Sequence, residues 1–500
     1  MFLRHYVSKT ILFPILYAIY VSCFYIFSAV QLLLLVSLLP ILTLLSQRQI
    51  KEKQQEHTLH VAIIGTGVRG LCSAVWLKRQ GVEVTIFESG DDIGGTWSTF
   101  AYDSSTLQMP SIAYTFHHSN QWPQPRASAG DIVKNLRHMC EKEELTNRIR
   151  LGDRVESIFR DKNRKFSINH HAGEQFDGVL ICTGHLSERM DMMSPGIETF
   201  AGEVVYPYEY EPSQIHRPGS KTLIVGGGAS AMEHIKYALD SGCQAIYWAV
   251  RRPKILQVDD VKRSLPLQDL IEFSPMWMTL IPQLIQWIEW PFLYRPIYAA
   301  HNMDNLFPSI WERPAIPQFN IYQEIQQGRV VPIRGKITGL RNHTVEITTA
   351  EGCQTLEADT IVSCTGFSYK VPSFFQEEYQ DDGTMLLADC PANVTFTSYG
   401  LGNSTMHAKL LYMHLVDPNT RPKVEENCGP NLLVPRNCWQ KDKKRLLHLS
   451  FYFVRYLISQ RSRFKWLVFF LSQSYPSLSK VSCIPRISRL WAPVFAPFGL

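Results

Sequence analysis

The sequence predicts an α/β protein that contains the same unit twice: a strand, a glycine-rich turn, a helix and a second strand. In the first copy an apolar run at 60–64 leads into a helix pattern that ends near residue 80, and a second strand follows at 83–88. The same order returns at 222–250. Short apolar runs that end in glycine are typical of buried parallel strands. We therefore expect two Rossmann-like units.

A long apolar segment precedes the first unit. No charged residue occurs from Ile11 to Leu45. As one helix this segment would measure about 50 Å, against about 30 Å for the hydrocarbon core of a membrane. It also exceeds the apolar part of a cleaved signal peptide. Because Pro14 and Pro40 bound its central part, we expect one tilted N-terminal transmembrane helix within residues 1–57.

The C-terminal tail is basic. Between Lys441 and Arg489 eleven Lys and Arg accompany a single acid, Asp442, in a chain whose net charge is +5. Neither apolar block of the tail reaches 18 residues. Residues 426–500 are therefore expected to lie on an anionic membrane surface, with a packed helical hairpin as the alternative. We expect no nucleic-acid partner.

Cysteine usage indicates a reducing compartment. The eleven cysteines are scattered, and no pair has C-x-x-C spacing. This pattern argues against a disulfide framework, a zinc site and a redox-active dithiol. We expect a membrane-attached protein whose body faces the cytosol, with the endoplasmic reticulum as a candidate location.

The first glycine-rich turn predicts a phosphate site. It reads Gly65-Thr66-Gly67-Val68-Arg69-Gly70, directly after the first strand. Such glycines permit a tight turn, close approach of a pyrophosphate to the backbone, and close packing of helix and strand. Glu88 ends the second strand, where a carboxylate can accept hydrogen bonds from ribose hydroxyls.

A second short motif, Gly94-Gly95-Thr96-Trp97, follows. Together with the first turn and Glu88, it resembles the FAD-binding half of the flavin-containing monooxygenases, the class B flavoprotein monooxygenases. Leu107-Gln108-Met109-Pro110, Tyr114 and Phe116 resemble that family's segment beside the flavin and substrate. The resemblance implies bound FAD.

The second glycine-rich turn has alanine at its third place, in Gly226-Gly227-Gly228-Ala229-Ser230-Ala231. The strand after its helix ends in Arg251 and Arg252 rather than an acid. Arginine can bind a 2′-phosphate that a carboxylate would repel, so NADPH is favoured over NADH.

Two further runs, ending in Thr183-Gly184 and Thr365-Gly366, resemble the strands through which such flavoproteins pass between their FAD and NADP domains. The resemblance implies that the NADPH-binding domain is inserted in the FAD-binding domain. We expect FAD-binding parts at 58–212 and 331–425. An NADPH-binding domain with an aromatic substrate segment is expected at 213–330.

Several positions depart from the family or carry no chemistry. Tyr206 stands where the family's linker motif has histidine, and no Asn occurs beside Gln108. His117-His118 and His170-His171 lack metal-site partners and spacing in the sequence, and we expect no metal. No Gly-x-Ser-x-Gly elbow is present, and no catalytic residue is predicted.

The resemblance implies a reaction. NADPH would reduce FAD, and the reduced flavin would react with O2 to give a C4a-hydroperoxide that transfers one oxygen atom. The apolar, aromatic segment 256–320 favours a small lipophilic substrate, oxygenated at nitrogen or sulfur. A Baeyer–Villiger ketone monooxygenase, a degenerate nucleotide-binding scaffold and an uncoupled NADPH oxidase remain alternatives.

Overall fold

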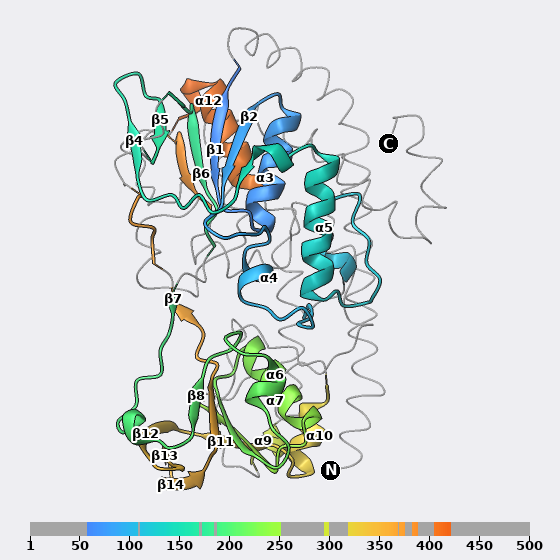
Figure 1. The fold of residues 1–500 in the computed structure, drawn as a ribbon, viewed down its shortest axis with the longest axis vertical. Helices are drawn as coiled ribbons and strands as arrows, with labels where there is room; N and C mark the ends of the chain where they lie inside the picture. Colours follow the sequence, from blue (N-terminus) through green and yellow to red (C-terminus); the bar gives the residue numbers. More distant parts are fainter. Residues whose placement is uncertain are drawn as a thin grey trace. The chain divides into compact units, whose positions relative to one another are not determined.

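The structure is a computed structural model of the 500-residue chain, and it describes residues 58–108, 111–169, 173–184, 188–251, 295–299, 319–368, 370–375, 383–388 and 405–421. The described residues form two compact units (Figure 1). The "first unit" comprises those from 58 to 184 and from 370 to 421. The "inserted unit" comprises those from 188 to 368.

A parallel sheet forms the centre of the first unit. Its strand order is β17-β6-β1-β2-β3, and each neighbouring pair is parallel. The strands are β1 (His60–Ile64), β2 (Glu83–Phe87), β3 (Ile149–Arg150), β6 (Gly178–Ile181) and β17 (Met385–Leu387). The expected strand–helix–strand unit is confirmed, with α3 (Val68–Arg79) between β1 and β2.

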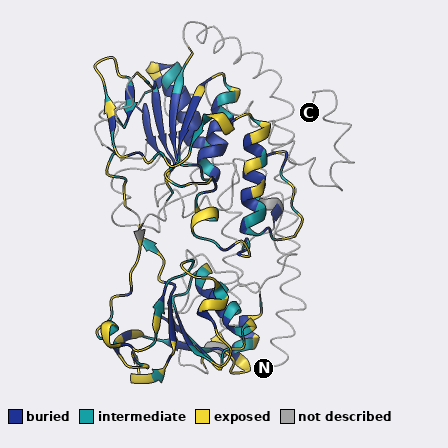
Figure 2. Ribbon diagram, viewed as in Figure 1, coloured by how far each residue is buried: buried dark blue, intermediate teal, exposed yellow. Residues whose placement is uncertain are grey.

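The two faces of this sheet are covered differently. Alternate strand residues, such as Ile63 and Leu180, pack in one core with α3, α5 (Ala129–Lys142) and α12 (Met406–Val416). Their neighbours, such as Ile64 and Ile181, pack on the opposite face with the antiparallel pair β4 (Ile158–Arg160) and β5 (Phe166–Ile168). The strands are therefore buried on both faces (Figure 2), which explains their continuous apolar sequences. Short helical segments complete this unit: α4 (Thr96–Thr99), η2 (Ser111–Tyr114), η3 (Thr146–Arg148) and η9 (Pro418–Thr420).

The inserted unit repeats this plan. Its parallel sheet has the order β11-β10-β9-β15-β8. One face packs against α7 (Ala229–Asp240) and α10 (Ile321–Gln326), and the other against an antiparallel sheet of β12, β13 and β14. The strands are β8 (Glu203–Val205), β9 (Lys221–Val225), β10 (Ala245–Val250), β11 (Val331–Arg334), β12 (Lys336–Arg341), β13 (Thr344–Thr349), β14 (Gly352–Glu357) and β15 (Thr360–Ser363). The remaining helices are η4 (Ile197–Thr199), α6 (Pro212–Ile215) and α9 (Arg295–Ala299).

The unit boundaries differ from the expected ones. Residues 188–212 and 331–368 were assigned to the FAD-binding part, but they belong to the inserted unit. The reason is the sheet order, because β15 pairs with β9 on one side and with β8 on the other. The ends of the unit meet in a short antiparallel pair of β7 (Glu188–Arg189) and β16 (Phe367–Ser368).

Three expectations fall outside the described residues: the N-terminal span in 1–57, the basic tail in 426–500, and most of the aromatic segment in 256–320. Among the helices of the described ranges, none combines the length and the hydropathy needed to cross a bilayer.

Candidate functional site

The first glycine loop has two glycines that the backbone requires and one that it does not. A Cβ atom on Gly65 would lie 2.3 Å from the carbonyl oxygen of Cys182, and one on Gly70 would lie 2.0 Å from the carbonyl oxygen of Gly65. At Gly67, which has an ordinary φ of −64°, the nearest atom to such a Cβ is the Gly95 Cα at 3.9 Å. Since the fold itself does not exclude a Cβ there, the absence of a side chain at Gly67 suits the approach of a ligand to the backbone.

The amino terminus of α3 suits an anion. Its N-cap is Gly67, which provides no side-chain cap, and the first turn contains no acidic residue. The free N–H groups and the helix dipole therefore face this loop without internal neutralisation. The loop fits a pyrophosphate, and binding there stays a prediction.

Glu88 is held against the same loop. One carboxylate oxygen accepts hydrogen bonds from the Thr66 N–H at 2.9 Å and the Thr66 hydroxyl at 2.5 Å. The other accepts from the Gly90 N–H at 2.9 Å. These bonds fix the carboxylate while leaving it lone pairs for ribose hydroxyls. The sequence argument did not identify Thr66, because its role depends on the return of the second strand.

The second motif lies on the first loop. A Cβ on Gly95 would stand 2.9 Å from the Gly67 Cα, and Gly95 has a φ of +57°. Thr96 begins α4. The Trp97 indole N–H donates to the Tyr114 hydroxyl at 2.8 Å, with the rings edge to face. Burial raises the pKa of Tyr114 to about 12, so its hydroxyl stays neutral and this aromatic wall is uncharged.

Gln108 belongs to the segment that is expected to lie beside the flavin. It is half-buried and directly precedes a gap in the described residues. Met109 and Pro110 fall in that gap. The structure therefore brings Gly65, Gly67, Gly70, Glu88, Gly95, Thr96 and Trp97 together, and leaves the contacts of Gln108 as a prediction.

The second glycine loop has the same construction. A Cβ on Gly226 would lie 2.1 Å from the carbonyl oxygen of Cys364, whereas nothing lies within 4 Å of one on Gly228. Gly228 is the N-cap of α7 and provides no side-chain cap, and the first turn has no acid. Ala231, the third position, is fully buried. This loop also fits an anionic ligand at a helix amino terminus.

Tyr208 contacts this loop from elsewhere in the chain, which the sequence did not reveal. Its hydroxyl lies 2.9 Å from the Ser230 hydroxyl and 3.1 Å from a Glu233 carboxylate oxygen, in the first turns of α7. Its φ of +69° lies in the left-handed region, which costs a bulky residue free energy. Burial raises the pKa of Tyr208, so the phenol stays protonated. It can therefore position Ser230 as a neutral partner.

Each of the two Thr-Gly segments lies next to one of the glycine loops. Thr183 and Gly184 follow Cys182, whose carbonyl faces Gly65. Thr365 and Gly366 follow Cys364, whose carbonyl faces Gly226. The Thr365 hydroxyl also donates to the carbonyl of Met190, in the neighbouring chain passage, at 2.9 Å. The two motifs follow β6 and β15, and the chain just before each motif contacts one glycine loop. One motif therefore belongs to each unit, in the same order as the loops.

The acids before these strands have matching roles. The backbone N–H of His60 donates to the carboxylate of Asp177 at 3.0 Å, and that of Lys221 donates to Asp359 at 2.8 Å. In return, the N–H groups of the two aspartates donate to the carbonyls of His60 and Lys221. Each acid thus fixes the start of the strand that leads into a glycine loop.

Tyr206 acts where the chain enters the inserted unit. Its hydroxyl accepts a hydrogen bond from the Met192 N–H at 3.0 Å, and the Arg189 guanidinium lies 3.8 Å from its ring centroid. Arg189 also pairs with Glu209. An aromatic hydrogen-bonding residue thus holds this passage, although the family's histidine is absent.

Arg251 directly follows β10 and is exposed, in accordance with its predicted position at the end of the second strand. Arg252 lies outside the described residues. No acid occupies the β10 end, where a ribose 2′-phosphate would lie.

The buried thiols are unsuited to redox chemistry. Burial raises the pKa of Cys140 to about 12 and also raises that of Cys364. All cysteines among the described residues are free. These two described thiols are therefore hard to ionise and poor nucleophiles.

A family model described as "Pyridine nucleotide-disulphide oxidoreductase" matches residues 59–271. The chain is also similar to the acetone monooxygenase (methyl acetate-forming) of Gordonia, with 26% identity over 36% of this chain and 35% of that protein. It is 25% identical to rat dimethylaniline monooxygenase [N-oxide-forming] 4, over 63% of this chain and 60% of that protein. The first of these matches spans about a third of the relative's length.

Solved structures show the same fold. An oxidized steroid monooxygenase bound to NADP superposes with a TM-score of 0.57 at 16% identity, over 80% of this chain and 97% of that one. The structure of OTEMO in complex with FAD and NADP gives 0.53 at 17% identity, over 71% and 85%.

Proposed function

We propose that this chain is an FAD- and NADPH-dependent monooxygenase of the class B flavoprotein monooxygenase family. The observation that carries the proposal is the pair of glycine loops, one in each unit. Each stands at a helix amino terminus without a side-chain cap, and an added Cβ on Gly67 or Gly228 would meet no backbone atom closer than 3.9 Å. Two such loops fit two dinucleotides.

The first unit would hold FAD. Its loop has Glu88 fixed by Thr66 for the ribose, and the Gly95–Trp97 segment lies against Gly67 with an uncharged aromatic wall. The inserted unit would hold NADPH, with phosphates at Gly228 and Ser230 and the 2′-phosphate near Arg251. Bound FAD supplies the electron-transfer and oxygen chemistry, and the chain supplies binding, orientation and exclusion of water.

We place the substrate among small lipophilic amines and thioethers. The support is the apolar and aromatic composition of 256–320. In addition, oxygen transfer to a soft nucleophile does not require an acid–base pair from the protein, and the sequence predicts none. Baeyer–Villiger oxidation of ketones is the second candidate, since an acetone monooxygenase is among the relatives.

The test is NADPH oxidation by the purified, flavin-loaded protein with amines, sulfides and ketones assayed in parallel. We expect an amine or sulfide to raise NADPH consumption and to yield one oxygenated product per NADPH. Ester formation from ketones would replace the first candidate with the second. NADPH consumption that yields only hydrogen peroxide with every substrate would reject both.

Membrane attachment is part of the proposal, supported by the uncharged segment at 11–45 and the basic tail. Salt screens basic residues on an anionic surface but does not extract a spanning helix. We expect the protein to stay in the membrane pellet after a wash with about 1 M salt. At that salt concentration the Debye length is about 3 Å, so attraction between basic residues and lipid is largely screened. Deletion of residues 1–57 should make attachment salt-sensitive. Release of the intact protein by salt would reject the span.

A further inference from the structure

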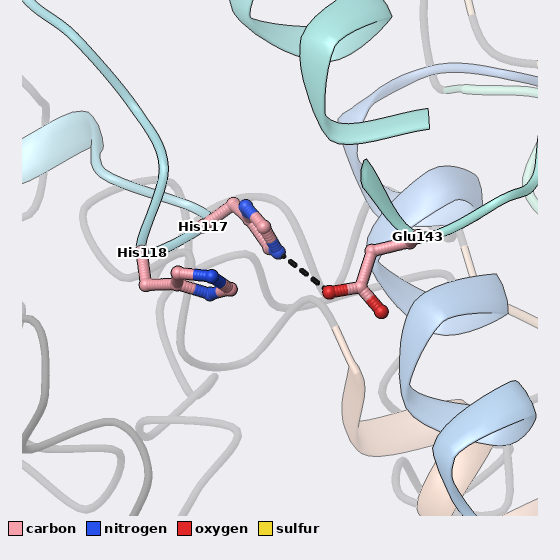
Figure 3. A group of neighbouring side chains, drawn as sticks. All are labelled: His117, His118 and Glu143. Atoms are coloured by element: carbon pink, nitrogen blue, oxygen red, sulfur yellow. Dashed lines mark hydrogen bonds and ion pairs between the residues drawn. The ribbon is translucent and has the colours of Figure 1, made fainter. Parts of the chain in front are cut away.

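A group of potential metal ligands lies in the first unit, away from the glycine loops' own residues. His117 and His118 follow the η2 segment, and Glu143 is the C-cap residue of α5 (Figure 3). The Nε2 atom of His117 lies 2.9 Å from a Glu143 carboxylate oxygen. One ligand atom from each of the three residues lies within 4.8 Å of the others. The sequence could not reveal this group, because Glu143 comes from a different element.

The environment of His117 aims one nitrogen at this group. The ring is buried, and its Nδ1 atom lies 2.7 Å from the Ser119 hydroxyl. The Ser119 backbone N–H donates to Nδ1 at 3.3 Å, so the ring proton lies on Nε2, facing Glu143, and a bound ion would replace that proton. A partner on the second nitrogen is the usual support of a metal-bound histidine. His118 is exposed and Glu143 half-buried, so an ion can enter from solvent.

Arg79, in the last turn of α3, also approaches this group. Its Nε donates to one Glu143 oxygen at 3.2 Å, and its terminal NH2 group pairs with the other. The same NH2 group is 3.4 Å from the His117 Nε2. The arginine side chain is 45% exposed, so it can move into solvent. A cation thus already neutralises Glu143, and a metal ion would have to compete with it.

We propose that His117, His118 and Glu143 form a binding site for a divalent transition-metal ion such as Zn²⁺, and that Arg79 acts as its competing internal cation. Two imidazoles and one carboxylate suit Zn²⁺ and neighbouring metals rather than Mg²⁺ or Ca²⁺, which prefer oxygen ligands. A tetrahedral ion with bonds of about 2.0–2.1 Å needs ligands about 3.4 Å apart, and a fourth position stays open to water.

The site would connect two parts of the first unit. Glu143 ends α5, whereas His117 and His118 belong to the segment that carries Tyr114. Tyr114 accepts the hydrogen bond from Trp97, beside the first glycine loop. A bound ion would therefore restrain this segment next to the proposed flavin site without contacting the flavin.

The test is titration of the full-length, flavin-loaded protein with ZnCl2 after removal of metals by EDTA and dialysis, followed by calorimetry. We expect one site that His118→Ala weakens at least about tenfold, because it removes one ligand. Glu143→Gln and His117→Gln should weaken it further. Arg79→Gln should strengthen it about tenfold, since a neighbouring positive charge disappears. MgCl2 should not displace Zn²⁺.

The matched control is His138→Ala, because His138 is an exposed histidine on α5 near a glutamate, 3.9 Å from Glu141. It should leave the affinity unchanged. His118 is exposed, so its variant tests the site even if the His117 variant fails to fold. The proposal is overturned if wild type and Arg79→Gln both fail to bind Zn²⁺. It is also overturned if His118→Ala binds as tightly as wild type, or if Arg79→Gln weakens binding.

Discussion

Single glycines in the two loops have different roles, and substitution can separate them. At Gly65 an added Cβ would overlap the Cys182 carbonyl, and the φ of +105° is strained for any L residue. Gly65→Ala should therefore destabilise the first unit by more than about 2 kcal/mol. At Gly67 an added Cβ would make only an ordinary contact, 3.9 Å from the Gly95 Cα, and the φ is ordinary. Gly67→Val should leave the fold intact but block the backbone from a pyrophosphate.

We expect purified Gly67→Val to be folded and largely colourless, and Gly65→Ala to unfold at lower denaturant concentration. Circular dichroism and the flavin absorbance near 450 nm, roughly where oxidised flavins absorb, distinguish the two. The control is Gly228→Val, at the equivalent place in the inserted unit, which should keep its flavin while its KM for NADPH rises. A yellow Gly67→Val protein would show that the first loop does not hold FAD.

The charge of Arg251 should decide the choice of nicotinamide nucleotide. A charge-assisted contact to phosphate contributes about 1.5–3 kcal/mol, which corresponds to roughly 10- to 150-fold in affinity. We expect wild type to prefer NADPH over NADH by at least about tenfold in kcat/KM. Arg251→Ala should remove most of that preference by weakening NADPH alone. We expect only one of the two neighbouring arginines, Arg251 or Arg252, to show the full effect.

Unchanged preference in the Arg251→Ala/Arg252→Ala double variant would place the 2′-phosphate elsewhere. Arg217→Ala is the control, since Arg217 is an exposed arginine of the same unit that pairs with Glu203. Arg217→Ala should leave kcat/KM unchanged for both NADPH and NADH.

At the scale of elements, two buried histidines couple α6 to α7. The Nε2 atom of His216, just after α6, lies 2.9 Å from the Nδ1 atom of His234 on α7. Burial lowers the pKa of His216 to about 4 and that of His234 to about 3. Both rings are therefore neutral in the folded state, but protonate near pH 6.5 when unfolded.

The sign of the pH effect follows from these values. The unfolded chain binds more protons than the folded one below pH 6.5, so stability falls as pH falls from about 6.5 towards about 4. The His216 shift alone corresponds to about 3 kcal/mol. Melting temperatures of His216→Phe/His234→Leu measured from pH 7 to pH 4 should show a weaker acid dependence than wild type. His343→Phe, at an exposed histidine, is the control. Parallel pH dependence in all three proteins would contradict the assignment.

Elements were predictable where their signal is local. The strand–helix–strand order around Gly65–Gly70 and Gly226–Ala231 could be predicted, because apolar runs and glycine turns are contained in short windows. The partners of those loops could not. Thr66 reaches Glu88 only after β2 returns to the sheet, and Tyr208 reaches Ser230 from outside the repeated unit.

The ends of the inserted unit were predicted wrongly for a related reason. Assignment of β8 and β15 depends on sheet order, which pairing between distant strands decides. The Thr-Gly motifs are the better signal, since Gly184 comes four residues before Glu188 of β7 and Gly366 directly precedes β16. His117, His118 and Glu143 are brought together only by the packing of α5.

At the scale of the whole molecule, the described residues of the first unit come from both sides of the inserted unit, whose own described residues lie between 188 and 368. In the first unit's sheet, β17 comes from after the insertion and pairs with β6 from before it. The inserted unit has its own two cores, and its ends are paired, with Ser368 opposite Glu188. Its removal should therefore leave the first unit's elements and their core complete.

We expect replacement of residues 190–366 by a two-residue Asn-Gly turn, which suits an antiparallel pair, to give a folded protein that binds FAD but cannot oxidise NADPH. The matched deletion is 213–330, which follows the boundaries expected from sequence. It removes β9 and β10 but keeps β8 and β15. The edge of β15 would then lose its pairing with β9, and the apolar faces of both strands would lose the neighbouring strands of their sheet. That protein should be insoluble or expose hydrophobic surface to a dye. Flavin absorbance and cooperative thermal unfolding measure the first outcome. If the 190–366 replacement failed to fold while the 213–330 deletion remained soluble and yellow, the first unit would need β8 and β15, and the boundaries derived from sheet order would be wrong.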